Sequence, residues 1–167
     1  ESHYDLIAAW DMHTYMQEKI RFSPVMCSFA VPERGKSRTG KGMIYVAYRG
    51  IRVESLREAY IFRIAEYWNA SIFFDVMIIW GKAVKQNSED LLLNRFEKGL
   101  TVPRVLYPDR GPHEDTVYYN IFGPTIIATN VEMHKILDTR AVIINMPDSD
   151  KKFENDVTPE GGLVLKE

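Results

Sequence analysis

The sequence predicts an α/β protein built on a parallel sheet. Short, β-branched apolar runs alternate along the chain with segments of helical spacing, which is the pattern typical of parallel α/β sheets. A stretch rich in glycine and lysine, AVPERGKSRTGKG, directly follows the first of these runs. Its two Gly-Lys pairs raise the question of whether the chain binds a triphosphate.

The composition indicates one globular domain. The chain has 167 residues, 46% of them apolar and 26% charged, a balance typical of soluble proteins. Its longest apolar stretch, SIFFDVMIIW, is half the length that spans a membrane. The net charge of −2 creates no global field for nucleic acid, so any such contact must come from a local patch. We expect a cytoplasmic protein, excised from a longer chain because it begins at Glu1 rather than Met.

The periodicity of the apolar residues predicts the individual elements. Helical spacing indicates helices over 4–20, 54–68, 88–99 and 131–138, with Ser55 as a helix cap. Apolar runs predict strands over 24–30, 71–75, 124–130 and 140–146. Two β-rich arms around a Pro-Asp-Arg-Gly-Pro turn predict a hairpin over 104–122, and the polar segment after Pro147 predicts a loop.

Several residues with reactive or aromatic side chains have a structural interpretation. Cys27 lies in an apolar run and is predicted to be a buried small hydrophobe. The four histidines lack the spacing of metal ligands, so no metal site is expected among them. The tryptophans are interpreted as packing anchors rather than as a base-stacking platform; they are Trp10, Trp68 and Trp80.

The glycine-lysine stretch fits a phosphate-binding loop in two registers. The first runs from Ala30 to Ser37 and follows the strand directly, but it has Ala30 where glycine is usual. The second begins at Gly35, five residues past the strand, and ends in Gly42, which offers no hydroxyl to a metal ion. Metal ligation and strand placement favour the first register, with Lys36 reaching the phosphates. The alternative interpretation of the stretch is a basic, flexible surface loop.

Polar residues at the ends of two later strands, and an arginine before the last strand, stand in the order that such a site needs. Asp75 ends an apolar strand 39 residues after Lys36, where a carboxylate could hold Mg²⁺. Thr129 and Asn130 end another strand, where a polar side chain could orient the attacking water. Arg140 stands just before the last strand, which is where ring ATPases carry the arginine that reaches a neighbour's γ-phosphate.

With these features in place, the sequence resembles the AAA+ branch of the P-loop ATPases. It is most similar to helicase- and primase-associated members encoded by viruses, plasmids and other mobile elements. The resemblance covers residues 4–147, and its most specific part is YNIFGPTIIATNVEMHKILDTRAVIINMP. The segments AAWDMHTYM and SLREAYIFRIAE resemble the N-terminal helix of that family and the helix before its Walker B strand.

The resemblance implies that the cofactors are ATP and Mg²⁺, and it implies a set of site residues. The implied catalytic residues are Asp75 as the Walker B aspartate, Asn130 as sensor 1 and Arg140 as the arginine finger. The implied magnesium ligands are Ser37 and Asp75. The implied nucleotide-binding residues are Ala30, Pro32, Glu33, Arg34, Gly35, Lys36, Ser37 and Arg38.

The resemblance also implies an architecture and an assembly. The expected fold is a three-layer P-loop NTPase of AAA+ type, with about five parallel strands, a core over 1–147 and a polar tail over 148–167. Subunits would form a ring, usually hexameric, and a hairpin inserted before the sensor-1 strand would line its pore. The candidate contacts of that hairpin with single- or double-stranded DNA are Arg104, Arg110 and His113. The implied function is ATP hydrolysis by the motor domain of a DNA-replication or mobile-element helicase.

Three departures from the family pattern keep other functions open. Val76 stands where a glutamate usually follows the Walker B aspartate, and valine cannot accept a proton. Glu33 stands where glycine is usual, and only about twenty residues follow Pro147 to build a helical lid. Val76 in particular favours the alternative of a nucleotide-binding switch or scaffold with little or no hydrolysis. A small-molecule kinase is a third, weaker alternative.

Overall fold

Five parallel strands form the central sheet of the computed structural model, which describes residues 2–30, 35–76, 78–111, 114–131, 134–146, 157–158 and 160. Each ladder in this sheet is parallel, and the end of the first strand, Phe29, lies opposite Thr129 and Asn145. The strands, in their order across the sheet, are β2 (Gly50–Val53), β3 (Ser71–Phe74), β6 (Thr125–Thr129), β1 (Val25–Phe29) and β7 (Ala141–Asn145). The prediction of a parallel α/β sheet is confirmed.

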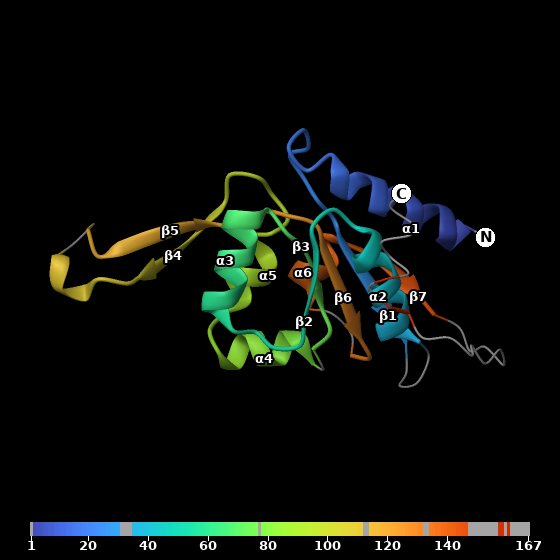
Figure 1. Cartoon of the computed structure of the whole chain (residues 1–167). Coiled ribbons are helices and arrows are strands. Elements are labelled where there is room, and N and C mark those ends of the chain that lie inside the picture. Colours follow the sequence, from blue (N-terminus) through green and yellow to red (C-terminus); the bar gives the residue numbers. More distant parts are fainter. Residues whose placement is uncertain are drawn as a thin grey trace.

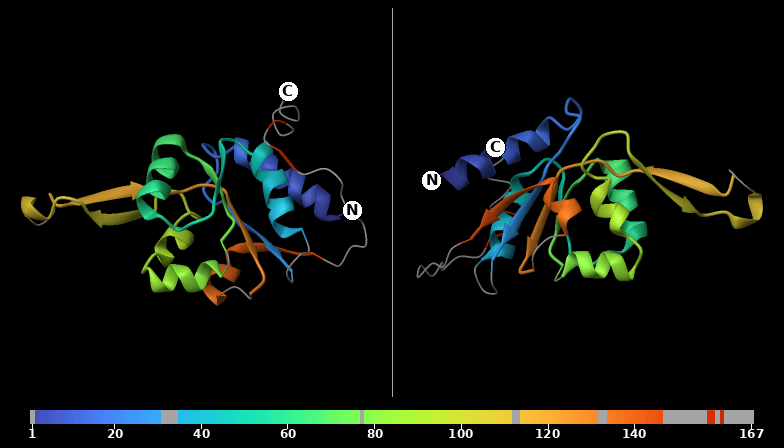
Figure 2. Two further views of the ribbon diagram at one scale, coloured as in Figure 1. Left: turned by 60° about the horizontal axis from the view of Figure 1, so that its bottom comes forward. Right: turned by 180° about the vertical axis from the view of Figure 1, so that it is seen from behind.

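Helices cover both faces of this sheet (Figure 1 and Figure 2). Neighbouring side chains of a strand point to opposite faces, so Phe73 packs in a cluster with residues of the first two helices and Phe74 packs in a cluster with residues of the other four. The helices are α1 (Ser2–Tyr15) and α2 (Lys36–Val46) on one face, and α3 (Glu58–Trp68), α4 (Ile79–Lys85), α5 (Glu89–Leu93) and α6 (Lys135–Asp138) on the other.

The inner strands are short apolar runs because both of their faces are covered. Each residue of β3 and of β6 is buried, as expected for parallel strands between two layers of helices. Cys27 on β1 is fully buried and burial raises the pKa of its thiol to about 12, so its predicted structural role is confirmed.

The chain leaves two neighbouring strands toward opposite faces of the sheet. After β1 it enters α2 on one face, and after β6 it enters α6 on the other. In open α/β sheets, ligands bind outside the carboxyl ends of the strands at the point where the connections diverge in this way. The carboxyl ends of β1 and β6 are therefore the expected place for a site.

A two-stranded hairpin projects from the body of the molecule (Figure 1). Its strands, β4 (Thr101–Val105) and β5 (Thr116–Asn120), are antiparallel. The segment between them contains a short 3-10 helix, Pro108–Arg110. At its base, Tyr119 stacks on Phe62 of α3 with ring centroids 4.6 Å apart. The predicted hairpin before β6 is confirmed.

Several predicted boundaries were wrong. The first helix ends at Tyr15 rather than at residue 20, and the predicted helix 88–99 is reduced to α5. Helix α3 begins at Glu58 with Arg57 at its cap, not with Ser55. Strand β2 and helix α4 were not predicted. Among the described residues, no helix combines the length and the apolar character needed to cross a membrane.

Candidate functional site at the carboxyl edge of the sheet

The residues predicted to bind nucleotide lie along one edge of the sheet, where the strands end. Ala30 follows β1, and its N–H donates to the carbonyl of Thr129 on β6, 3.3 Å away. Asp75 follows β3, and its N–H donates to the carbonyl of Val53 on β2. Parallel pairing thus brings segments far apart in the sequence to one edge.

Gly35 and Lys36 form the entry to helix α2. Gly35 adopts a left-handed conformation with φ 79°, which glycine allows at no steric cost, and its carbonyl accepts from the N–H of Thr39 at 2.9 Å. The Lys36 ammonium donates to the carbonyl of Ala30 at 2.9 Å, and burial lowers its pKa. Lys36 is therefore held back over the end of β1. The intervening predicted residues, Pro32, Glu33 and Arg34, lie outside the described part of the chain.

Ser37 and Asp75 meet at this edge. The Ser37 hydroxyl donates to Oδ1 of Asp75 at 2.8 Å, across 38 positions of sequence. A hydroxyl and a carboxylate are oxygen ligands of the kind that Mg²⁺ prefers, and in P-loop enzymes one of each holds the ion together with phosphate oxygens. The pair fits magnesium, while Arg38 lies one residue further along α2.

Two further charged residues lie beside Asp75 and were missed in the sequence. Arg52 on β2 donates to Oδ2 of Asp75 from Nε at 3.0 Å and from Nη2 at 2.7 Å. The same Nη2 lies 2.8 Å from Oε1 of Glu54, whose side chain is 69% exposed. Glu54 is thus an accessible carboxylate at the carboxyl edge. The motif GIRVE could have indicated it, had the strand been recognised.

The position after Asp75 points into the core rather than into the site. Val76 is 2% exposed and belongs to the cluster that also contains Phe74 and Ile79. A longer, charged side chain there would meet apolar neighbours. Two acidic residues that follow later in the sequence, Glu89 and Asp90, lie on α5, where Asp90 pairs with Arg104.

Asn130 follows β6 and is exposed at the same edge. The Thr129 hydroxyl accepts from the N–H of Val131 at 3.1 Å and donates to its carbonyl at 3.0 Å. These bonds fix the turn that contains Asn130. Since Thr129 lies opposite Phe29, this turn adjoins the segment that leads to Lys36.

Arg140 lies at the opposite edge of the sheet. Its carbonyl accepts from the N–H of Val25, the first residue of β1, and its guanidinium donates to the carbonyl of Leu93 at 2.8 Å. The guanidinium carbon lies 5.7 Å from the centre of the Phe96 ring. The structure therefore does not bring Arg140 together with Lys36 within one chain.

The hairpin residues predicted to contact DNA have different surroundings. Arg104 is clamped by two carboxylates: its guanidinium lies 2.9 Å from Glu58 and 2.9 Å from Asp90. Its charge is therefore already neutralised, and we no longer consider it a phosphate contact. Arg110 is exposed and covers the ring of Tyr107 at 4.0 Å. His113 lies outside the described residues.

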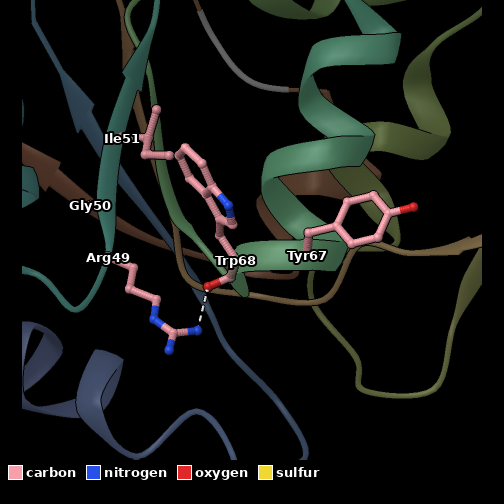
Figure 3. Close-up of a pocket in the computed structure, with 5 residues that line it drawn as sticks. All are labelled: Arg49, Gly50, Ile51, Tyr67 and Trp68. Carbon is pink, nitrogen blue, oxygen red and sulfur yellow. Dashed lines mark hydrogen bonds between the residues drawn. The ribbon is translucent and has the colours of Figure 1, made fainter.

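A pocket of about 450 Å³ lies where β2 begins, at the opposite edge of the sheet from Lys36. It is formed where β2 begins and α3 ends (Figure 3), and it is lined by Arg49, Gly50, Ile51, Tyr67 and Trp68. Among the described residues, no group of three His, Cys, Asp or Glu side chains is arranged to hold a metal ion. A magnesium ion carried by phosphates needs fewer protein ligands than such a group.

No protein-family model matches the chain, and a search of curated proteins found no match. What is established is the class: an α/β protein with a five-stranded parallel sheet between helices. Any more specific function has to be argued from the geometry at the carboxyl edge.

Proposed function

We propose that this chain is a Mg-ATP-binding domain of the P-loop ATPase type. The observation that supports this most is the 2.8 Å hydrogen bond between the Ser37 hydroxyl and Asp75. It joins the residue after the loop lysine to the carboxylate of a nearby strand, the two protein ligands that such enzymes use for Mg²⁺. The site also lies where the connections from β1 and β6 diverge.

Each residue at the edge has a task in this proposal. The left-handed Gly35 turns the chain into α2, so that backbone N–H groups at the start of this helix face the phosphates. Lys36 leaves the Ala30 carbonyl and neutralises the β- and γ-phosphates. Asn130 orients the attacking water from the end of β6.

Glu54 is the carboxylate that we assign to the attacking water in place of Val76. It lies on the same edge as Asp75, shares the Nη2 donor of Arg52 with it, and is open to solvent. A general base needs such an accessible carboxylate near the γ-phosphate. Arg52 would hold the carboxylates of Glu54 and Asp75 in fixed positions relative to each other.

The site is completed by a second subunit in this proposal. Arg140 faces away from the Lys36 edge of its own sheet and donates to the Leu93 carbonyl, so in this proposal it would leave that carbonyl to reach a γ-phosphate in a neighbouring molecule. The proposed assembly is therefore a ring, in which ATP hydrolysis would drive movement along DNA. Arginine supplied from a neighbour is worth several orders of magnitude in the rate of phosphoryl transfer.

A nucleotide switch with little hydrolysis is the second candidate. The burial of Val76 favours it, because this chain cannot place a carboxylate at the usual position. The two candidates share the binding site and differ only in turnover.

Calorimetric titration of the full chain with Mg-ATP tests the site. We expect Lys36→Ala to weaken binding at least about tenfold, because a charge-assisted contact is lost. Ser37→Ala should weaken the magnesium dependence of binding. Lys41→Ala is the matched control in the same helix and should change affinity less than about twofold. If Lys41→Ala abolishes binding and Lys36→Ala does not, the assignment is wrong.

Hydrolysis separates the two candidates. Phosphate release from Mg-ATP by the wild type, lost in Glu54→Gln with binding retained, supports the ATPase. Tight binding without phosphate release at any protein concentration supports the switch.

A further inference from the structure

We propose that the exposed face of α3 is a binding platform for single-stranded nucleic acid, which stacks its bases on aromatic side chains. The platform consists of Arg49, Tyr60, Arg63, Tyr67 and Trp68. It lies at the end of β2 opposite to Arg52, so this site is separate from the proposed ATP site and does not depend on it.

The aromatic side chains of the platform are exposed to solvent. Tyr60 is 50% exposed, Trp68 58% and Tyr67 74%. Of the other two tryptophans, Trp10 is buried and Trp80 is partly buried and stacks on His134, so Trp68 alone departs from the predicted packing role. Exposed aromatic rings are the element on which bases of any sequence stack.

The end of α3 fixes how these rings are presented. Asn69 adopts a left-handed conformation with φ 48°, and the N–H of Ala70 donates to the carbonyl of Ile64, so the helix stops directly after Trp68. The Arg49 guanidinium donates to the Trp68 carbonyl at 2.8 Å. Figure 3 shows the indole lying beside Ile51 and the Tyr67 ring pointing away from β2. The pocket is therefore built before any ligand arrives.

The spacing along α3 suits an extended strand. Tyr60, Arg63 and Tyr67 follow one another at intervals of three and four residues and so share one helix face. From Tyr60 to Tyr67 the helix rises by about 10 Å, roughly the length of three stacked nucleotides. The pocket that Tyr67 and Trp68 line lies at the last turn of α3, next to the end of this row.

The charges on the platform favour it over the hairpin as the surface that contacts nucleic acid. Exposed arginines accompany the aromatic rings: Arg49, Arg57 and Arg63. The acidic residues of the same helix are Glu66 and Glu58, and Glu58 is paired with Arg104. A guanidinium among aromatic rings can bind a phosphate and also stack on a base. The hairpin tip instead carries Asp109, Glu114 and Asp115 around Arg110, and a negative surface repels phosphate.

Fluorescence anisotropy of the full chain, without nucleotide or magnesium, tests the platform. The probes are fluorescein-labelled oligo(dT) and oligo(U) of about 20 nucleotides, which distinguish DNA from RNA, with a duplex of equal length for comparison. Binding should weaken as salt rises from about 50 to 200 mM. Intrinsic tryptophan emission should be quenched on binding, since Trp68 is the exposed tryptophan.

Matched variants separate the platform from the hairpin. We expect Trp68→Ala and Tyr67→Ala each to weaken binding at least about fivefold, and Trp68→Phe to retain most of it, because phenylalanine keeps an aromatic face. Arg63→Ala should also reduce the salt dependence. Arg110→Ala, which removes a guanidinium-aromatic pair from the hairpin, should change binding less than about twofold. Far-ultraviolet circular dichroism and melting curves check that each variant is folded.

Two results would overturn the proposal. One is binding that folded Trp68→Ala and Tyr67→Ala leave unchanged, whether or not Arg110→Ala abolishes it. The other is an absence of binding to each probe, combined with self-association that the Trp68 and Tyr67 variants abolish, which would make the platform a protein interface. Because the assay contains no nucleotide, failure here leaves the ATP site untouched.

Discussion

Arg52 donates two hydrogen bonds to the same carboxylate oxygen of Asp75, at 3.0 Å from Nε and 2.7 Å from Nη2. A planar guanidinium fixes a carboxylate in one orientation in a way that an ammonium cannot. Oδ1 of Asp75 is thereby turned toward Ser37.

If this orientation serves hydrolysis, Arg52→Ala should lower the turnover of Mg-ATP about a hundredfold and change its dissociation constant less than about threefold. Steady-state phosphate release and calorimetry measure the two quantities. Arg52→Lys should restore little of the rate, because it restores charge without the fork. Loss of ATP affinity equal to the loss of rate would mean that Arg52 binds phosphate itself.

Gly40 and Gly42 in α2 allow a matched test of how tightly this helix packs on the sheet. A Cβ at Gly40 would overlap the ring of Phe73, whereas a Cβ at Gly42 would meet nothing within 4 Å. We expect Gly40→Ala to lower the free energy of unfolding by about 1–3 kcal/mol through overpacking. Gly42→Ala should raise it by about 0.5–1 kcal/mol, because alanine favours the helix. Urea denaturation measures both, and equal effects would contradict the packing argument.

Arg95 is fully buried and donates to neutral groups. Its guanidinium bonds Thr125 at 2.8 Å and the carbonyls of Ala70 and Ile121 at 2.9 Å, with a longer bond to Pro124. Burial lowers its pKa to about 9, so it is charged at neutral pH. Arg95→Met should destabilise the fold by roughly 3 kcal/mol or more, since several buried carbonyls lose their donor.

The control for Arg95 is Arg21→Met. Arg21 pairs with Glu97 at the surface, with 74% of its side chain exposed, so its loss should change stability by less than about 0.5 kcal/mol. Thermal melts in one buffer compare the two variants.

Glu58 and Arg104 hold the hairpin to α3. The hydrogen bond from Arg104 lowers the pKa of Glu58, so the bond contributes stability above the ordinary pKa of a glutamate and loses it as the pH falls through the lowered value. Glu58→Gln should therefore speed amide hydrogen exchange in the hairpin at pH 7, while β1 and β6 stay protected. Uniform acceleration across the sheet would show that the hairpin is not a separate unit.

The pKa of Asp11 on α1 is shifted in the opposite direction to that of Glu58. Burial raises its pKa to about 7, and its Oδ1 has no hydrogen-bond partner among the described residues. The folded state thus binds a proton more tightly, so stability is greatest below the unfolded pKa near 4 and falls as the pH rises toward 7. Asp11→Asn should raise the free energy of unfolding at pH 8 by about 1–2 kcal/mol after allowing for partial exposure, and with it the melting temperature, and should leave both unchanged at pH 4. Thermal melts of the wild type and the variant between pH 4 and pH 8 test this prediction.

Local patterns predicted those parts of the fold that local physics determines. The runs that became β1, β3, β6 and β7 are continuous apolar stretches bounded by turns, and such stretches suit a sheet covered on both faces. β2 was missed because its four residues include an arginine and it forms the exposed edge of the sheet.

Which side chains lie together in the site depends on how the strands pair, and the sequence showed this only in part. Ser37 and Asp75 were predicted from their positions after strands. Arg52 and Glu54 were not, because their proximity to Asp75 follows from the pairing of β2 with β3. The exposure of Trp68 depends on the helix ending at Asn69, which helical spacing alone does not show.

Strand β2 has a different polar contact at each of its two ends. Arg49, just before it, holds the Trp68 carbonyl, and Arg52, within it, holds Asp75. Gly50 and Ile51 separate these arginines, and the three steps from Arg49 to Arg52 span about 10 Å. The same short strand therefore carries one polar contact of the pocket and one of the carboxyl edge.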